Sequence, residues 1–308
     1  MQNSPKVPLW SVDTTIEIPY GVAPSGHRMA GAMRLGPVHL QIANLARSLD
    51  YYQRTLGMKV LERGEHGAVL GAWEEPGPLV VLHERAGATP VPRRGRLGLY
   101  HFAILLPDRP SLGRFVKHLA DSGVHAGMSD HAVSEAIYLY DPDGLGIEVY
   151  ADRPRELWRS ENQQLVLALD PLDVEGLVRE AGDDLWQGMP AGTTMGHIHF
   201  FVPDLARAEA FHHQGLGLDK IAWSYPGALF LSAGGYHHHV AVNTWAHGAE
   251  PAGPSDARLL EWTIELPGPE EADAVTRSLA DAGAEVGGEP GARTVLDPFG
   301  NLLRLTTS

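Results

Sequence analysis

Short alternating runs of apolar and polar residues, each followed by an amphipathic helical pattern, recur along the chain. The run LGPVHLQIAN from Leu35 leads into one such helix, and MGHIHFFVPD from Met195 leads into another. Weaker copies begin near Leu97 and Arg258. A period of two residues predicts a strand, whereas apolar spacings of three and four predict a helix. The chain therefore contains four imperfect copies of one strand–helix unit.

Each copy continues into shorter strand-like runs. In chain order these end in PLVVLHE, GIEVYAD, HHHVAVNTW and NLLRLTT. The turn motif DPDG in the second copy has a counterpart, DPFGN, at the equivalent place in the fourth. We therefore expect an α+β fold of four βαβββ modules, at about residues 35–85, 97–152, 195–247 and 257–307.

The modules are separated into two halves by a segment without the repeat pattern. Within this segment, in PLDVEGLVREAG, Pro171 and Asp173 predict the start of a short helix. The expected divisions are a leading arm (1–34), modules one and two (35–152), a connecting segment (153–194) and modules three and four (195–308).

Composition excludes several classes of function. The chain has 308 residues, with 24 Lys and Arg against 38 Asp and Glu, so its formal net charge is −14. This acidity argues against nucleic acids and anionic membrane surfaces as partners. The absence of cysteine excludes disulfides, thiolate zinc sites, iron–sulfur clusters and a cysteine nucleophile. The opening MQNSPKVPLWSVDTTIEIPYG lacks a signal-peptide core and no apolar run could span a bilayer, so we expect a cytoplasmic location.

Two segments carry a resemblance to a known family. They are SDHAVSEAIYLYDPDGLGIEVYADRP (129–154) and SAGGYHHHVAVNTW (232–245). With the four modules around them, they resemble the vicinal oxygen chelate superfamily, in its extradiol catechol 2,3-dioxygenase-like branch. The resemblance implies that two modules curl into a cup that holds a metal, with ligands on the first and last strands of each module.

The family's spacing of ligand positions marks six residues: Pro37, His101, His197 and Glu261 on first strands, and Glu148 and Arg304 on last strands. Pairing in tandem (module one with two, and module three with four) would place His101 and Glu148 opposite Pro37, whose side chain has no ligand atom. Pairing module two with module three would instead collect His101, His197 and Glu148 in one cup. We favour the second arrangement and keep the tandem one as the alternative.

Two imidazoles and one carboxylate make a facial triad, which is typical of Fe(II) and is also accepted by Mn(II). Such a triad leaves adjacent positions open for a catecholate and dioxygen. The resemblance thus implies an extradiol ring-cleaving dioxygenase whose partners are a small aromatic diol and O2, with a role in aromatic hydrocarbon catabolism. An exposed module edge is compatible with a homo-oligomer.

The resemblance also implies accessory residues. His238 is the expected acid–base group, and Tyr138 and His131 are expected to bind substrate oxygens or to orient a ligand. Strand alternation would turn His237 and His239 away from His238, although a bulge could exchange these roles. Two departures from the family pattern stand out: the Glu148 module precedes its partner, and two extra residues separate DHAVS from the tyrosine.

Other candidate residues have simpler interpretations. His39 and His199 are expected to be packing or surface residues, and His212 and His213 to lie on the surface of a helix. Three aromatic residues are expected to line the cup or, more simply, to pack beside it: Trp223, Tyr236 and Trp245. The glycines of SAGGY lack the strand–turn–helix context of a phosphate loop.

Two other functions remain open on this fold. One is a glyoxalase-like or epimerase-like proton transfer, which would want a second carboxylate base in the cup. The other is a non-enzymatic small-molecule binder, which would need no metal triad. The sequence does not identify the catechol or hydroquinone that would be cleaved, because fold does not fix substrate.

Overall fold

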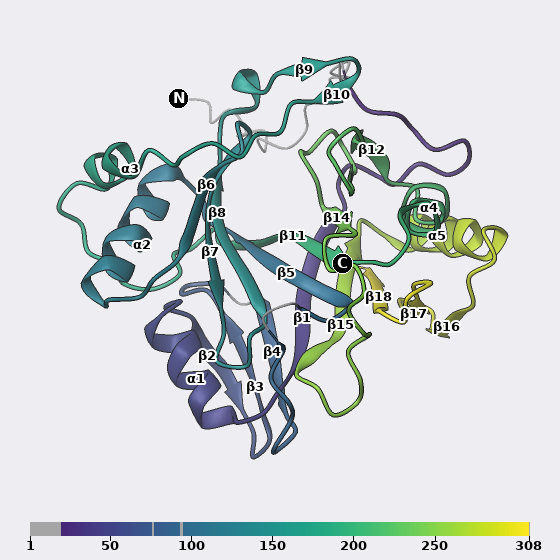
Figure 1. The fold of residues 1–308 in the computed structure, drawn as a ribbon. Helices are drawn as coiled ribbons and strands as arrows, with labels where there is room; N and C mark the ends of the chain where they lie inside the picture. The colour runs from purple at the N-terminus through teal and green to yellow at the C-terminus, as the bar shows by residue number, and fades with distance from the viewer. Residues whose placement is uncertain (1–19, 76, 93–94, 308) are drawn as a thin grey trace, which may run out of the picture.

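The chain forms two curled eight-stranded sheets, and two modules contribute to each sheet (Figure 1). The computed structural model describes residues 20–75, 77–92 and 95–307. Residues 1–19 of the expected leading arm lie outside the described residues. Every module follows the expected order of one strand, one helix and three strands.

The first two modules precede the connecting segment. Module one contains β1 (Arg34–Ile42), α1 (Leu45–Arg54), β2 (Lys59–Arg63), β3 (Gly67–Gly71) and β4 (Pro78–Glu84). Module two contains β5 (Gly98–Leu105), α2 (Arg109–Asp121), β6 (Gly127–Asp130), β7 (Ser134–Tyr140) and β8 (Gly146–Asp152).

The connecting segment and the last two modules complete the chain. The segment contains a 3-10 turn (Arg155–Leu157), β9 (Ser160–Glu161), β10 (Gln164–Leu165) and α3 (Val174–Ala181). Module three contains β11 (Thr194–Phe201), α4 (Leu205–Glu209), a π-helical turn (Ala210–Gly215), β12 (Asp219–Ala222), β13 (Ala228–Ser232) and β14 (Val240–Asn243). Module four contains β15 (Arg258–Leu266), α5 (Pro269–Asp281), β16 (Val286–Glu289), β17 (Ala292–Leu296) and β18 (Leu302–Thr307). The short helix expected in PLDVEGLVREAG is α3, and its first turn is capped by Asp173.

The sheet order decides how the modules pair. Modules two and three form the central-module sheet, in the order β12-β13-β14-β11-β5-β8-β7-β6. Modules one and four form the outer-module sheet, in the order β16-β17-β18-β15-β1-β4-β3-β2. In the middle of each sheet the two first strands run antiparallel, β5 beside β11 and β1 beside β15. The expected pairing of module two with module three is therefore confirmed, and the tandem arrangement is not found.

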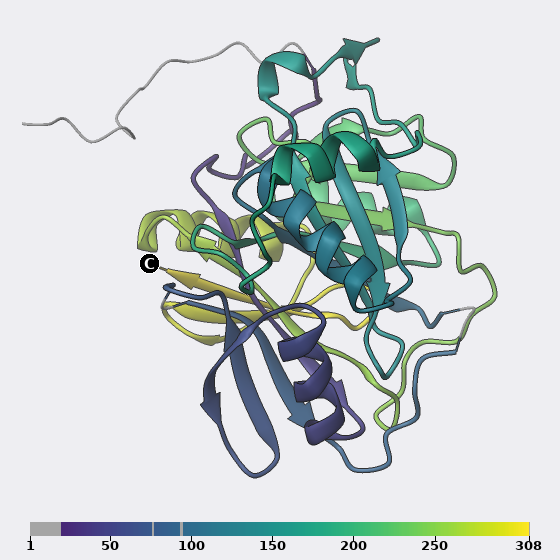
Figure 2. The same cartoon turned by 90° about the vertical axis from the view of Figure 1, so that its left-hand side faces the viewer.

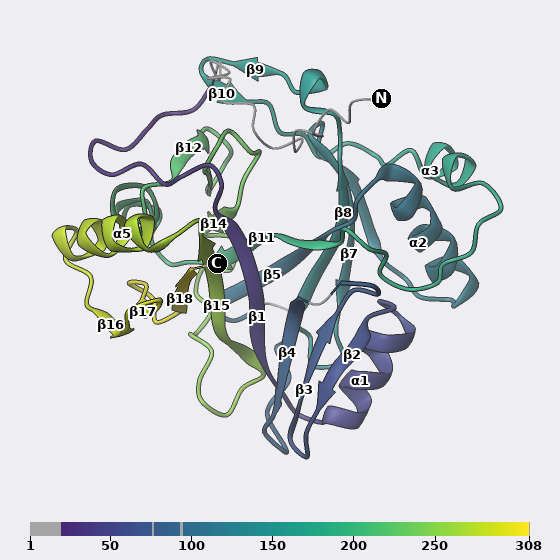
Figure 3. The same cartoon turned by 180° about the vertical axis from the view of Figure 1, so that it is seen from behind.

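The helices lie outside the sheets. Figure 2 shows α1, α2 and α3 on one side of the molecule, and Figure 3 shows β1 and β15 at its middle. Helices α4 and α5 lie on the opposite side from α2 (Figure 1). Within the described residues, no helix is long and apolar enough to cross a membrane.

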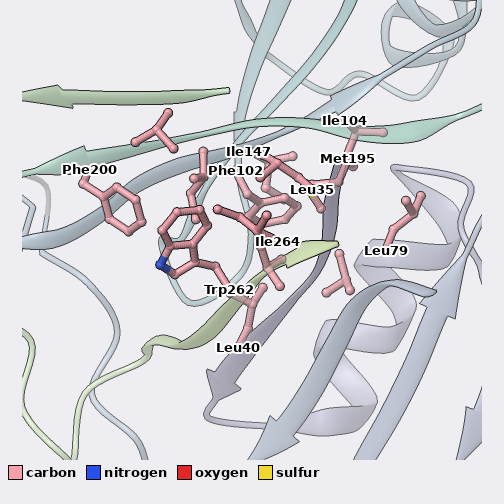
Figure 4. Packing of buried hydrophobic residues seen from close by; sticks show 14 of the residues in the cluster. Leu35, Leu40, Leu79, Phe102, Ile104, Ile147, Met195, Phe200, Trp262 and Ile264 are labelled. Atoms are coloured by element: carbon pink, nitrogen blue, oxygen red, sulfur yellow. The ribbon is translucent and has the colours of Figure 1, made fainter. Parts of the chain in front are cut away.

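The main core lies between the two sheets. Phe102 and Phe200 from the central-module sheet meet Leu40 and Trp262 from the outer-module sheet, and all four are at most 1% exposed (Figure 4). Because strand side chains alternate between faces, the neighbours of the two phenylalanines point away from this core. The central-module sheet is thus left with a second buried face, which carries polar residues.

A polar residue caps the start of the helix in each of the first three modules. Asn44 accepts a hydrogen bond from the Arg47 amide, Asp108 accepts one from Ser111, and Asp204 accepts two from the first turn of α4. Each side chain satisfies an amide that would otherwise lack a partner at a helix start. These caps fix the point at which each first strand ends and its helix begins.

The expectation that His212 and His213 lie on a helix surface is wrong. They are 0% and 2% exposed, respectively. The helix widens into a π-helical turn at this point, which directs both rings inward. His212 packs near the rings of Phe200 and Trp262, and its Nδ1 bonds the Ala208 carbonyl. Both histidines are therefore part of the core.

Asp141, in the DPDG turn, links the second module to α1. It accepts hydrogen bonds from the amides of Asp143 and Leu145 and from the Tyr52 hydroxyl. Burial raises the pKa of Asp141 from 3.8 to about 7. Between these values the folded chain keeps a proton that the unfolded chain has lost. The stability contributed by Asp141 therefore falls as the pH rises, by about 1.4 kcal/mol per unit.

We expect Asp141→Asn to remove this pH dependence. The asparagine carbonyl can still accept from the two backbone amides, but it carries no titrating proton. Relative to the wild type, the variant should gain stability from about pH 4 to about pH 7 and then stay constant. Urea unfolding at pH 5, 6, 7 and 8 measures the difference in the free energy of unfolding. A difference that does not change with pH would contradict the buried-proton explanation.

Candidate metal centre

Two histidines and one glutamate converge on the polar face of the central-module sheet. His101 comes from β5, Glu148 from β8 and His197 from β11. The Nε2 atoms of both histidines lie 3.0 Å from Oε2 of Glu148. One ligand atom of each residue lies within 4.8 Å of the other two. The three residues are 4%, 2% and 1% exposed, in chain order.

The strand register explains this convergence. Ala103 pairs with Glu148 across the parallel β5–β8 edge and with His197 across the antiparallel β5–β11 edge. His101 lies two residues before Ala103, so it points to the same face of β5. The methyl group of Ala103 leaves room for the larger side chains on both sides. Segments about 50 residues apart in sequence thus meet at one point.

The cluster holds its charges in the state that metal binding requires. Burial raises the pKa of Glu148, but the two imidazoles outweigh burial and place this pKa well below its ordinary value. Burial lowers the pKa of His101 and His197, more than the adjacent carboxylate raises it. The favoured set is one carboxylate and two neutral imidazoles, which are the deprotonated forms that coordinate metals.

Three of the four ring nitrogens in the cluster lack a hydrogen-bond partner in the described part of the chain. Both nitrogens of His101 and Nδ1 of His197 are buried without a hydrogen bond among the described residues. The approach of His101 Nε2 to Glu148 is close in distance but does not have hydrogen-bond geometry. Buried polar atoms without partners are costly, and a divalent cation would satisfy His101 Nε2 directly. The residues present therefore fit a metal ion.

A cavity of about 190 Å³ opens beside the cluster. His101 and Glu148 form part of its wall, together with the rings of Tyr225 and Phe230. Leu169 and Trp245 also line it and are 66% and 47% exposed, so they lie at its mouth. The wall is mostly apolar, which suits an aromatic ligand next to a polar centre.

His131 and Tyr138 meet on one wall of this cavity. His131 Nδ1 lies 2.8 Å from the Ala168 carbonyl, and its Nε2 lies 2.6 Å from the Tyr138 hydroxyl. A carbonyl can only accept, so Nδ1 donates, and in the neutral ring Nε2 accepts from Tyr138. Burial raises the pKa of Tyr138 well above its ordinary value, so the phenol keeps its proton. Its oxygen lone pairs remain free to accept a hydrogen bond from a ligand.

His238 also lines the cavity, with its ring centroid 4.1 Å from that of His197. Its Nδ1 lies 2.8 Å from Nδ1 of His237, whose Nε2 lies 3.0 Å from Asp152 Oδ1. The expected alternation does not hold for His237, because residues 237–239 precede β14 in an irregular loop rather than in a strand. His237 therefore contacts His238 instead of turning away from it.

This chain of contacts fixes the proton positions. The carboxylate of Asp152 accepts from His237 Nε2. In the neutral form of the His237 ring, Nδ1 then accepts from His238. His238 then carries its proton on Nδ1, and its Nε2 has a free lone pair. Burial, His197 and His237 lower the pKa of His238 well below its ordinary value, which keeps this ring neutral.

Sequence reasoning missed part of the cavity wall. His199 was expected to be a packing or surface residue, but it is 4% exposed and lines the cavity. The signal was its position two residues after His197, which puts both rings on one face of β11. The connecting segment contributes Leu167 to Leu169, which no pattern in the sequence distinguished. Of the three aromatic candidates, Trp245 lines the cavity, while Tyr236 packs behind it and bonds Asp152.

The equivalent positions of the outer-module sheet are filled differently. Arg304 forms a two-pronged ion pair with Glu261, with nitrogen–oxygen distances of 2.7 and 2.6 Å. Pro37, at the position equivalent to His101, lies on the neighbouring strand β1. The guanidinium thus neutralises the carboxylate that a metal would need.

Paired βαβββ modules with a buried cluster of metal-binding side chains define a class of metal-dependent proteins. The sequence pattern of the Glyoxalase/Bleomycin resistance protein/Dioxygenase superfamily matches residues 34–149 and 194–305. The chain belongs to this superfamily, and the resemblance seen in its sequence is confirmed.

Individual relatives support this placement. A catechol-2,3-dioxygenase from Bacillus subtilis (strain 168) is 44% identical over 268 residues, which cover 86% of this chain and 93% of that protein. A lactoylglutathione lyase from Neisseria meningitidis serogroup A is 32% identical over 125 residues, or 38% of this chain and 88% of that protein. A solved structure of a presumed dioxygenase from Bacillus subtilis aligns with a TM-score of 0.63 at 13% identity, covering 91% of this chain and 86% of that one. The last likeness is one of fold alone.

Proposed function

We propose that this protein is an extradiol dioxygenase that cleaves the ring of a catechol-type substrate with O2. The observation that carries the proposal is the buried cluster of two histidines and one glutamate beside an apolar cavity. The catechol-2,3-dioxygenase relative, which matches most of this chain, supports the same reaction.

Fe(II) is the proposed cofactor, with His101, Glu148 and His197 as its ligands. A bound Fe(II) would supply the redox chemistry that lets a catecholate react with ground-state dioxygen. The three residues would hold the ion through two imidazole nitrogens and one carboxylate oxygen, and two of them, His101 and Glu148, also line the cavity. Mn(II) accepts the same ligand set and is the alternative metal.

The cavity selects the size of the substrate. A dry cavity of about 150 Å³ accommodates benzene, so about 190 Å³ suits a single aromatic ring with its hydroxyl groups. Phe230 and Tyr225 would pack against the ring and exclude water from it. Trp245 and Leu169 at the mouth would cover the part of the substrate that faces solvent.

Protons are handled by His238 and Tyr138. The free Nε2 of His238 would take the proton from one substrate hydroxyl, and the same ring would later return it. Asp152, acting through His237, keeps the His238 proton on Nδ1 and so keeps Nε2 ready. Tyr138 donates to His131 and would accept a hydrogen bond from the other hydroxyl. This arrangement binds both hydroxyl groups without a second carboxylate.

A glyoxalase-like proton transfer is the second candidate, because a lactoylglutathione lyase matches part of the chain. Such a reaction would want a second carboxylate base. Glu148 is the single carboxylate among the described residues that line the cavity. The dioxygenase is therefore the better-supported function.

Oxygen consumption tests the proposal. Protein loaded with Fe(II) without oxygen should take up one O2 per catechol and form a yellow ring-fission product. His101→Ala, which lacks a ligand, should abolish uptake, whereas His39→Ala on the outer-module sheet should not. Two results would reject the dioxygenase: no uptake with any catechol or hydroquinone although iron is bound, or turnover that does not depend on oxygen.

A further inference from the structure

His199 is a buried histidine that neither the metal cluster nor the proton-handling residues use. It lines the cavity on β11, and its ring lies 5.0 Å from that of His101 in an edge-on orientation. On its other side are the rings of Phe230 and Trp245, at 5.9 and 5.7 Å. It therefore lies between the metal-binding end of the cavity and the aromatic wall near the mouth.

A hydrogen-bond chain fixes the tautomer of His199. The backbone amide of Trp245 donates to Oδ1 of Asn243 at 2.9 Å, which identifies that atom as the oxygen. The opposite atom, Nδ2 of Asn243, must then donate to Nε2 of His199 at 2.8 Å. A neutral imidazole that accepts at Nε2 carries its proton on Nδ1.

The Nδ1–H group of His199 lacks a partner in the part of the chain that the structure describes. No described residue accepts a hydrogen bond from this atom, and the atom is not enclosed by protein. Because the residue as a whole is buried in the cavity wall, the open space that Nδ1 reaches is the cavity. A fixed, unpaired donor in an apolar pocket favours a ligand that brings an acceptor to it, since an unmet donor costs free energy.

The rest of the wall restricts which acceptor this is. No lysine or arginine is among the described residues that line the cavity. A carboxylate on the ring substituent would be buried in this wall without a lysine or arginine to pair with it, which is costly. A carbonyl or ether oxygen needs only one donor. The wall thus suits an uncharged substituent.

We propose that His199, held by Asn243, is a specificity-determining residue that donates a hydrogen bond to an uncharged acceptor oxygen on a ring substituent of the substrate. The proposal rests on the proposed function for the identity of the ring as a catechol. It names the substrate class more closely: single-ring catechols whose substituent carries a neutral oxygen acceptor, with carboxylated catechols excluded.

Three catechols that differ in one substituent test this. 4-Acetylcatechol carries an acceptor, 4-ethylcatechol keeps the same two-carbon substituent without the acceptor oxygen, and 3,4-dihydroxybenzoate carries a charge. The enzymes are the wild type, His199→Phe, which keeps a ring but has no donor, and His199→Gln, which restores an N–H group. His83→Phe, on an exposed strand position of the outer-module sheet, is the matched control. The measurements are kcat and KM with Fe(II)-loaded protein, and the Kd of each compound without oxygen.

The acetyl group also changes the reactivity of the ring. Each variant is therefore compared with the wild type by the ratio of its values for 4-acetylcatechol and 4-ethylcatechol. In His199→Phe the kcat/KM for 4-acetylcatechol relative to 4-ethylcatechol should fall about tenfold, mainly through KM, as expected for one hydrogen bond. The ratio of the Kd values for the two compounds should change by the same factor. His199→Gln should recover most of the lost preference for 4-acetylcatechol, and His83→Phe should keep the wild-type ratios. 3,4-Dihydroxybenzoate should bind at least about tenfold more weakly than 4-acetylcatechol.

Unchanged ratios in His199→Phe would overturn the inference, as would preferred binding of the carboxylated compound. These outcomes differ from a failure of the proposed function. If the iron-loaded wild type cleaves no catechol or hydroquinone at all, the dioxygenase assignment fails. The oxygen-free Kd values for the three compounds still decide whether His199 selects the acceptor.

Discussion

Glu148→Gln should abolish ring cleavage and iron binding together. Glutamine keeps the size of the side chain but removes the charge that makes this buried cluster attractive to a dication. A metal that stabilises charge in the transition state contributes several kcal/mol, so activity should fall by about a thousandfold or more. Iron per chain by elemental analysis and oxygen uptake measure the two effects.

The control for Glu148→Gln is a glutamate elsewhere in a strand. Glu62, exposed on β2, offers the same substitution without contact to the cluster. Glu62→Gln should keep full iron content and full activity. An active Glu148→Gln variant with one iron per chain would show that the carboxylate is not a ligand.

His238→Gln should leave iron binding intact and slow turnover strongly. This variant removes the group that would take the substrate proton, and general acid–base catalysis contributes about 10²- to 10⁴-fold. The loss should appear in kcat rather than in KM, because the cavity wall that binds the ring is kept. Steady-state kinetics with iron-replete protein separates these effects.

Asp152→Asn tests the same proton pathway from further away. The amide can no longer hold His237 in one tautomer, so His238 loses its fixed proton on Nδ1. We expect a smaller fall in kcat than in His238→Gln.

A His238→Gln variant whose kcat stays within twofold of the wild-type value would show that His238 has no part in the mechanism.

Much of the fold was predictable because its signals are local. Alternating strands, the capping residues Asn44, Asp108 and Asp204, and the DPDG turn each act over a few residues. The pairing of distant modules was also predictable, because Pro37 and Arg304 could not serve as metal ligands. The pairing follows from which side chains can bind a metal rather than from the spacing of apolar residues, and the sheet order agrees with it.

Other features depend on tertiary structure and were not predictable from local pattern. The burial of His212 follows from a π-helical turn, which the helical period does not encode. The contact of His237 with His238 follows from an irregular loop where a strand was expected. The role of Leu167 to Leu169 in the cavity wall depends on the path of a segment that has no repeat.

The two sheets are nested in the sequence: modules two and three pair with each other, and modules one and four, which flank them, form the other pair. The strands around the cluster all belong to the middle of the sequence, from β5 to β14. By contrast, β1 can pair with β15 only after both central modules have been synthesised. Pairing β1 with β15 joins Val38 to Trp262, which are farther apart in sequence than Ala103 and His197 in the central-module sheet. The outer pairing therefore has the larger loop-closure entropy cost. The candidate metal-binding pocket can thus form during synthesis before module one pairs with module four. Until then the unpaired edge of β1 needs protection from strands of other chains.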